Sequence, residues 1–208
     1  MLVVTASAVY GFFGAIRLIY PLRYEDYIEE YSDRYGLDKY LVMAVIKAES
    51  NYIYNAHSGV ARGLMQITDS TADWIAGKLG CEFEREDIEN PEININMGCY
   101  YLRYLLDYYN EDVNLALAAY NAGMGNVNKW LADSESGTEN SLDSIPFSET
   151  ERYLSRIEKG IKIYQRLNSL LTKNFTGGMN YEHSNYNRKT IRKWRKRAWA
   201  DSRKKTRI

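Results

Sequence analysis

The sequence predicts a mainly α-helical domain, and three observations support this prediction. Only 3 of the 208 residues are proline. Apolar residues recur at the spacing of an amphipathic helix in several long segments. Strand-like alternation does not stand out anywhere except in a small hairpin around residues 53–68. A chain of this length is expected to bury one sizeable core, with room for tails.

The first predicted helices have local start and stop signals. Residues 24–35 place tyrosines and Ile28 near one face, and Gly36 ends this helix. Asp38 is expected to cap the helix that carries Glu49. Asp69 or Ser70 is expected to cap a further helix, which runs through Trp74 and Ile75 and ends at Gly80. Residues 81–90 are acidic and connect this helix to the next one.

The second half of the domain is also predicted to be helical. Asn90 and Pro91 begin a strongly apolar, central helix that continues to about Tyr109. Residues 112–120 form a short helix that leads into a loop at Tyr120, where Gly123 and Gly125 allow a close approach of the backbone to another group. Further segments follow in chain order: a helix at 126–132, a polar loop at 133–146, and a last long helix from Glu149 to about Leu171.

Charge divides the chain into three predicted parts. Residues 24–172 hold 13 basic and 25 acidic side chains, whereas residues 173–208 hold 12 basic and 2 acidic ones, so the formal net charge of zero hides an acidic domain and a basic tail.

The hydrophobic segment 1–23 precedes the domain, and Arg17 is the only charge in residues 1–22. We expect residues 1–22 to be a membrane anchor; a signal-like peptide and a helix packed on the domain are the alternatives. Arg17 and Arg23 follow the segment, which by the positive-inside rule favours a cytoplasmic domain and conflicts with an external one.

The chain has only 2 cysteines and 2 histidines, which is too few for a disulfide framework. Cys99 lies within the apolar central helix and is expected to be a small buried residue, although a bridge to Cys81 would be feasible outside the cytoplasm. We expect no metal site and no cofactor.

The chemistry of the chain is expected to centre on Glu49. This carboxyl follows the apolar run Leu41–Ile46 and precedes a loop that contains Gly59 and Gly63. Such a position removes water from the carboxyl group, which disfavours the charged form and raises the pKa. A carboxylic acid that keeps its proton near neutral pH is what glycosidic cleavage requires of a general acid.

Three short motifs give the chain a family resemblance. They are Glu49-Ser50, Gly63-Leu64-Met65-Gln66 and Ala119-Tyr120-Asn121-Ala122-Gly123. In this order they resemble the lytic transglycosylase family, of the soluble-lytic-transglycosylase type with a lysozyme-like helical domain and a substrate cleft. The resemblance spans roughly residues 24–170, and a further pattern supports it: Pro91, Asn94, Ile95, Gly98, Tyr101 and Leu102.

The resemblance implies cleavage of peptidoglycan at the MurNAc-β-1,4-GlcNAc bond. Most glycosidases use two carboxylates, but the three motifs contain only Glu49. The 6-hydroxyl of N-acetylmuramic acid would then attack its own C1, which gives a 1,6-anhydromuramoyl product, with Glu49 acting first as acid and then as base. The alternatives are a hydrolytic muramidase like the goose-type lysozymes and a non-catalytic glycan-binding module. A nucleic-acid binder based on the tail would leave the motifs unexplained, so no nucleic acid is expected.

The resemblance also suggests substrate-binding residues, and for Ser50 and Met65 a structural alternative stays open. Ser50 orients Glu49 or contacts an N-acetyl group, or else it caps its helix. Met65 and Gln66 line the cleft, although Met65 suits core packing equally well. Tyr120 offers a ring and Asn121 an amide, while Tyr153 matches the family tyrosine whose hydroxyl reaches the catalytic Glu.

One stretch departs from the family pattern. Members usually read Ser-x-x-Gly-Ala before the Gly-Leu-Met-Gln motif, whereas this chain has Val60 where the glycine is usual. We therefore assign no substrate contact to Ser58, and we expect His57 to face solvent.

The predicted location is the cell envelope, outside the cytoplasm, with the chain anchored in the membrane by residues 1–22. The basic tail 173–208 has no counterpart in the family pattern. It is expected to be solvated, and to contact anionic wall polymers or lipid if it has a partner.

Overall fold

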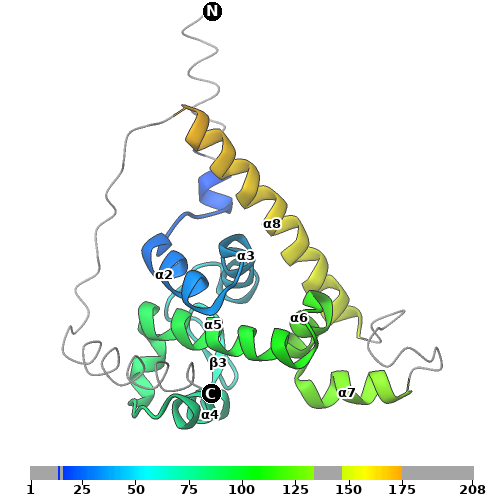
Figure 1. Ribbon diagram of the computed structural model, residues 1–208. Helices are drawn as coiled ribbons and strands as arrows, with labels where there is room; N and C mark the ends of the chain where they lie inside the picture. The colour runs from blue at the N-terminus through cyan, green and yellow to red at the C-terminus, as the bar shows by residue number, and fades with distance from the viewer. Residues whose placement is uncertain (1–13, 15, 134–146, 175–208) are drawn as a thin grey trace, which may run out of the picture.

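The structure is a computed structural model that describes residues 14, 16–133 and 147–174 (Figure 1). It confirms the mainly α-helical prediction. The helices are α2 (Glu25–Tyr35), α3 (Lys39–Ser50), α4 (Asp69–Leu79), the 3₁₀ helix η1 (Arg85–Glu89), α5 (Pro91–Tyr108), α6 (Val113–Ala122), α7 (Met124–Asp133) and α8 (Ser148–Asn174). The strands are β1 (His57–Ser58), β2 (Ala61–Arg62) and β3 (Ile67–Thr68).

The helix α5 lies at the centre, as its apolar sequence predicts. It packs against α2, α6 and η1, while the long helix α8 runs along α3 and also contacts α6 (Figure 1). Ile95, Leu102 and Leu105 on α5 are each 0% exposed, as are Val42 and Ile46 on α3. The α3 helix is therefore held between α2 and α8, which fixes the position of its last turn and of Glu49.

Most predicted helix ends are confirmed. Asp38 caps α3 by accepting a hydrogen bond from the Tyr40 N–H, and Asn90 caps α5 by accepting from Glu92 and Ile93. Gly36 ends α2 and Gly80 ends α4 in the left-handed conformation.

Two local predictions are wrong. The cap of α4 is Thr68, whose Oγ1 accepts from the Thr71 N–H, because Asp69 instead forms ion pairs with Arg62 and Arg85. Tyr120 lies in the last turn of α6 and not in a loop. A methyl group at Gly123 or Gly125 would meet no atom of the described residues within 4 Å, so both glycines face open space there.

The predicted hairpin is part of a three-stranded antiparallel sheet in the order β1-β2-β3. His57 pairs with Arg62 and Ser58 with Ala61, which leaves Gly59 and Val60 as a two-residue turn. Gly59 takes the positive φ of 61° that such a turn requires, and Val60 is 72% exposed. Val60, at the position where the family usually has glycine, is accommodated because Gly59 supplies the positive φ one position earlier.

Cys81 and Cys99 are both buried and form no disulfide, which confirms Cys99 as a small core residue and excludes the bridge between them in this structure. Within the described residues, no helix combines the length and apolar character that are needed to cross a bilayer. The predictions for residues 1–13, for most of the loop at 133–146 and for the tail beyond Asn174 lie outside the described residues.

Candidate active site

Glu49 lies in the last turn of α3, after six buried apolar residues and before the left-handed cap residue Asn51. Burial raises the pKa of Glu49 to about 7, while the hydroxyl of Tyr153 and the charge of Arg156 act in the opposite direction. The carboxyl group is therefore protonated in an appreciable fraction of molecules near neutral pH. This agrees with the argument from the apolar run of α3.

Tyr153 reaches Glu49 from α8, 104 residues later in the chain. Its hydroxyl donates a hydrogen bond of 2.5 Å to Glu49 Oε1, and the side chain is only 1% exposed. Burial and the nearby Glu49 charge raise the pKa of Tyr153 well above the usual value, so the phenol stays protonated and acts as the donor. The packing of α8 along α3 positions this pair.

Tyr120 connects the second and third motifs. Its hydroxyl donates to the backbone carbonyl of Met65 at 2.8 Å, and its ring lies 5.4 Å from the Tyr101 ring. Burial, followed by the charge of Glu49, raises the pKa of Tyr120 well above its ordinary value. The tyrosine therefore lies within electrostatic reach of the carboxyl group.

Asn121, the next residue, is fixed from α8. Its Oδ1 accepts a hydrogen bond of 3.0 Å from the hydroxyl of Thr150, one helical turn before Tyr153. The same helix face therefore contacts both the Glu49 motif and the Tyr120-Asn121 motif.

The Gly-Leu-Met-Gln segment is held by Asn94 on α5. Asn94 Oδ1 accepts from the Met65 N–H at 2.7 Å, and its Nδ2 donates to the carbonyls of Arg62 and Ile88. A side chain at Gly63, where φ is 79°, would collide with this amide, so the motif requires glycine at that position.

Met65 does not line an open cleft. Its side chain is 0% exposed and packs against Gly98 on α5, which is the core-packing alternative. Ser50 is 6% exposed, and its hydroxyl donates to the Ile46 carbonyl one turn earlier in α3. This bond belongs to the helix itself and favours the structural alternative for Ser50.

Gln66 has a constrained backbone and an unused acceptor. Its φ is +48°, which is uncommon outside glycine, and its Nε2 donates to the carbonyls of Ala56 and Gly63. Its Oε1 is buried and has no hydrogen-bond partner among the described residues. The side chain thus braces the loop through its amide nitrogen.

Sequence reasoning missed three residues that shape the site: Asn94, Thr150 and Arg156. Asn94 belongs to the family-like pattern on α5, but the pattern alone indicates no role for its side chain. Thr150 and Arg156 lie three residues before and after Tyr153, so helical spacing from Tyr153 could have identified both. His57 is half exposed, as expected, and its Nε2 lies 2.9 Å from Glu89 Oε1.

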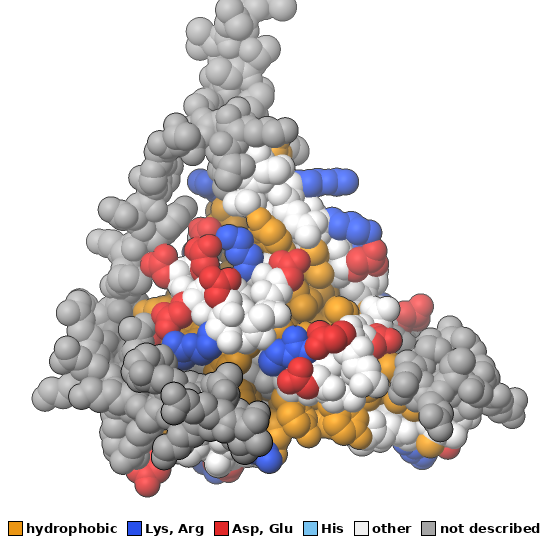
Figure 2. All heavy atoms as spheres, viewed as in Figure 1, with side chains coloured by type: hydrophobic (Ala, Val, Ile, Leu, Met, Phe, Trp, Pro, Cys, Tyr) orange, Lys and Arg blue, Asp and Glu red, His pale blue; other side chains and the backbone are white. Residues whose placement is uncertain are grey.

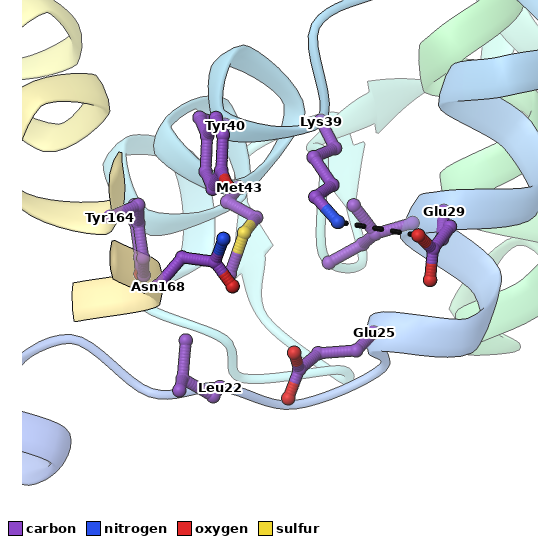
Figure 3. Close-up of a pocket in the computed structure, with 9 residues that line it drawn as sticks. Leu22, Glu25, Glu29, Lys39, Tyr40, Met43, Tyr164 and Asn168 are labelled. Atoms are coloured by element: carbon purple, nitrogen blue, oxygen red, sulfur yellow. Dashed lines mark hydrogen bonds and ion pairs between the residues drawn. The ribbon is translucent and has the colours of Figure 1, made fainter. Parts of the chain in front are cut away.

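The cavity drawn in Figure 3 is separate from this site. It has a volume of about 40 Å³ and lies between α2, the start of α3 and α8, where Lys39 bonds to Glu29. Lys39 and Glu49 are ten residues apart on one helix, which corresponds to about 15 Å along its axis. Neither Glu49 nor any other motif residue lines this cavity.

A family model described as the transglycosylase SLT domain matches residues 26–142, more than half of the chain. The chain belongs to this family. Its match includes Glu49, the Gly63–Gln66 motif and the Tyr120-Asn121 motif, whereas Tyr153 lies beyond the matched residues.

Proteins similar to this chain are named lytic murein transglycosylases. A soluble lytic murein transglycosylase of Salmonella typhimurium is 34% identical over 143 residues, which cover 66% of this chain and 22% of that protein. A membrane-bound lytic murein transglycosylase C of Edwardsiella ictaluri is 28% identical over 170 residues, or 70% of this chain and 47% of that protein. The chain therefore spans less than half of the length of either relative.

Solved structures give the same result for the fold. An inactive mutant of the lytic transglycosylase Slt from Pseudomonas aeruginosa superposes with a TM-score of 0.64 and 32% identity, over 72% of this chain and 25% of that one. A 70-kDa soluble lytic transglycosylase in complex with bulgecin A has a TM-score of 0.65 and 30% identity, with the same coverage of both chains. The fold of this SLT domain is thus the one found in lytic transglycosylases.

Proposed function

We propose that this SLT domain is a peptidoglycan lytic transglycosylase that cleaves the MurNAc-β-1,4-GlcNAc bond and forms a 1,6-anhydromuramoyl product. The observation that supports this most strongly is the Glu49–Tyr153 pair. A carboxyl with a pKa raised to about 7 is held by a phenol that can only donate to it. General acid catalysis favours a group whose pKa lies near the working pH.

Glu49 serves in both halves of the proposed reaction. In the first half it gives its proton to the glycosidic oxygen, and the bond from that oxygen to C1 of N-acetylmuramic acid breaks. In the second half the carboxylate takes the proton of the 6-hydroxyl while that oxygen bonds to C1. Between these steps the negative charge is stabilised by the Tyr153 hydroxyl and by Arg156, the two groups that lower the pKa of Glu49.

The single carboxyl supports the intramolecular route. Retaining and inverting glycosidases place a second carboxylate across the scissile bond. Within the described residues, the groups that shift the pKa of Glu49 are its buried surroundings, Tyr153 and Arg156, and none of them is a carboxylate. A nucleophile supplied by the substrate needs no second acid.

Three polar groups are proposed to bind the sugars next to Glu49. Gln66 Oε1 is a buried acceptor without a partner and suits the N–H of an acetamido group. Asn121 is oriented through Thr150, and its Nδ2 suits the carbonyl of such a group. The half-buried Tyr120 ring offers a surface for packing. No substrate contact is proposed for the side chains of Met65 or Ser50.

The domain organisation and location remain our proposal. Residues 1–22 would anchor the chain in the membrane with the domain outside the cytoplasm, in the cell envelope, and the basic tail would bind anionic wall polymers. The Tyr20 ring packs on Tyr164, and the Pro21 carbonyl accepts a hydrogen bond from the Tyr164 hydroxyl. These contacts favour an anchor whose membrane-spanning part ends before Tyr20, within the proposed segment.

Incubation of purified sacculi with the full chain tests the activity. Wild-type protein should release soluble muropeptides, and Glu49→Gln should release almost none while it keeps the circular dichroism spectrum of the wild type. A Glu49→Gln variant with more than a small residual activity would remove Glu49 from the proposed role. A wild type that binds sacculi without releasing fragments would favour the non-catalytic glycan-binding module.

A further inference from the structure

Four aromatic side chains form a continuous row along one face of α5 and the adjoining α4. Tyr101, Tyr104 and Tyr108 lie at helical spacing on α5, and Trp74 on α4 packs against two of them. The Trp74 ring centroid is 6.1 Å from Tyr101 and 4.6 Å from Tyr104, and Tyr104 is 6.4 Å from Tyr108. We call these four residues the aromatic row.

The aromatic row begins at the candidate active site. Its first member, Tyr101, contacts the Tyr120 ring at 5.4 Å, and Tyr120 lies within electrostatic reach of Glu49. From Tyr101 to Tyr108 the helix advances seven residues, which is about 10 Å. The row therefore extends away from the scissile position by more than the length of one sugar ring.

The rings of the row are more exposed than the residues on the inner side of α5. Leu102 and Leu105 on the inner side of α5 are 0% exposed, whereas Trp74, Tyr101 and Tyr104 are half-buried and Tyr108 is 49% exposed. Figure 2 shows hydrophobic side chains reaching the surface at the lower edge of the molecule, between α4 and α7. The row therefore presents aromatic surface to solvent beside the candidate active site.

Two polar side chains lie beside the aromatic row. The ammonium group of Lys78 lies 5.8 Å from the Trp74 ring centroid, and Asn128 on α7 donates to the Tyr108 hydroxyl at 3.0 Å. Half-exposed aromatic rings with polar groups at their edges suit pyranose rings, whose C–H faces pack on aromatic surfaces while their hydroxyl groups bond at the periphery.

We propose that the aromatic row binds the sugars of the glycan strand that lie beyond those next to Glu49. The proposal rests on the proposed function of the same site, which it extends from the reacting sugars to the length of strand that is held. The occupant is a β-1,4-linked N-acetylhexosamine strand. Its affinity should depend on the rings of Tyr104 and Tyr108, which are not part of the Glu49 machinery.

The test measures binding of the β-1,4-linked N-acetylglucosamine hexamer to the full chain by calorimetry, in the Glu49→Gln background so that nothing is cut. Tyr104→Ala and Tyr108→Ala should each raise the Kd roughly tenfold, because one stacked ring is lost. Tyr104→Phe keeps the ring and should leave the Kd unchanged. Tyr40→Ala removes another half-buried tyrosine at the opposite end of α3 and serves as the matched control (Figure 3).

Thermal unfolding of each variant confirms that it is folded at the temperature of the titration. A Kd for Tyr104→Ala and Tyr108→Ala equal to that of the parent would overturn the proposal. So would an equal loss of affinity in Tyr40→Ala, because a general structural effect would then explain all three. Release of muropeptides by the wild type is measured separately, so failure of the proposed activity and failure of the aromatic row are distinguished.

Discussion

Burial and two neighbouring groups shift the pKa of Glu49 in opposite directions, and the resulting pKa decides whether the carboxyl can act as a general acid. Loss of water raises its pKa, whereas the Tyr153 hydroxyl and Arg156 lower it, with a result of about 7. The residues needed for this balance come from the two helices α3 and α8, far apart in the sequence. Burial could be predicted from the apolar run of α3, but the partner could be named only through the family resemblance, because the chain contains 19 tyrosines.

Glu49 should lower the stability of the fold at alkaline pH. Its folded pKa of about 7 exceeds the usual value of 4.5, so the destabilisation is absent below pH 4.5, grows as pH rises toward 7 and is complete above 7. Glu49→Gln should therefore raise the free energy of unfolding at pH 8, by at most roughly 3 kcal/mol, and change it little at pH 4. Urea unfolding at the two pH values measures this, with Glu86→Gln, an exposed carboxylate of η1, as the control. An equal effect at both pH values would show that burial does not raise the pKa.

Arg156 should set the alkaline limb of the pH profile. The free enzyme needs a protonated Glu49, so kcat/KM should fall as pH rises through about 7. Because Arg156 lowers this pKa, Arg156→Gln should move the limb to higher pH, while Arg152→Gln, an exposed arginine on the same helix, should not. Initial rates of muropeptide release from pH 5 to 9 provide the measurement. A limb that stays in place in Arg156→Gln would exclude Arg156 as a partner of Glu49.

Helix boundaries were predictable where the signals are local. Asp38, Asn90, Gly36 and Gly80 act on backbone groups within a few residues, and all four are confirmed. The predicted cap of α4 is wrong because Asp69 forms an ion pair with Arg85, which lies in η1. No local sequence pattern indicates that pairing.

The burial of Met65 was undecidable from the sequence for a similar reason. It depends on α5 presenting Gly98 beneath the loop and Asn94 beside the Met65 backbone, which are contacts between segments that lie about thirty residues apart.

The Gly63 turn should be intolerant of a side chain. Gly63→Ala would require a positive φ of 79° and displacement of the Asn94 amide that holds Met65. We expect a loss of unfolding free energy of at least about 2 kcal/mol. Gly77→Ala in the exposed part of α4, where a methyl group meets nothing within 4 Å, should instead stabilise the fold by about 0.5–1 kcal/mol. Chemical unfolding of the two variants checks the contrast, and similar values for both would show that the turn has no such constraint.

At the scale of the whole molecule, charge separates the described domain from its tail. Figure 2 shows acidic side chains gathered over α2 and near the end of α5, whereas residues 173–208 hold 12 basic and 2 acidic residues. Composition alone predicted this asymmetry. It could not predict what the tail binds, because charge attracts any polyanion.

Removal of residues 175–208 should weaken binding to intact cell walls at low salt. The difference from the full chain should shrink as salt rises to physiological levels, since exposed charges are screened over about 8 Å at 0.15 M. Cosedimentation with walls across a salt series, with Glu49→Gln in both proteins to prevent lysis, gives the comparison. Equal binding by the two proteins at every salt concentration would show that the tail has no part in wall attachment.

The mass of the released muropeptides tests the central claim most directly. Sacculi digested by the wild-type chain should yield fragments that end in 1,6-anhydromuramic acid, lighter by one water than the hydrolysed fragments, because the substrate's own 6-hydroxyl replaces water at C1. Mass spectrometry of the separated fragments distinguishes the two products. Fragments that carry the additional water and a reducing end would contradict the transglycosylase reaction and assign the Glu49–Tyr153 site to a hydrolytic muramidase.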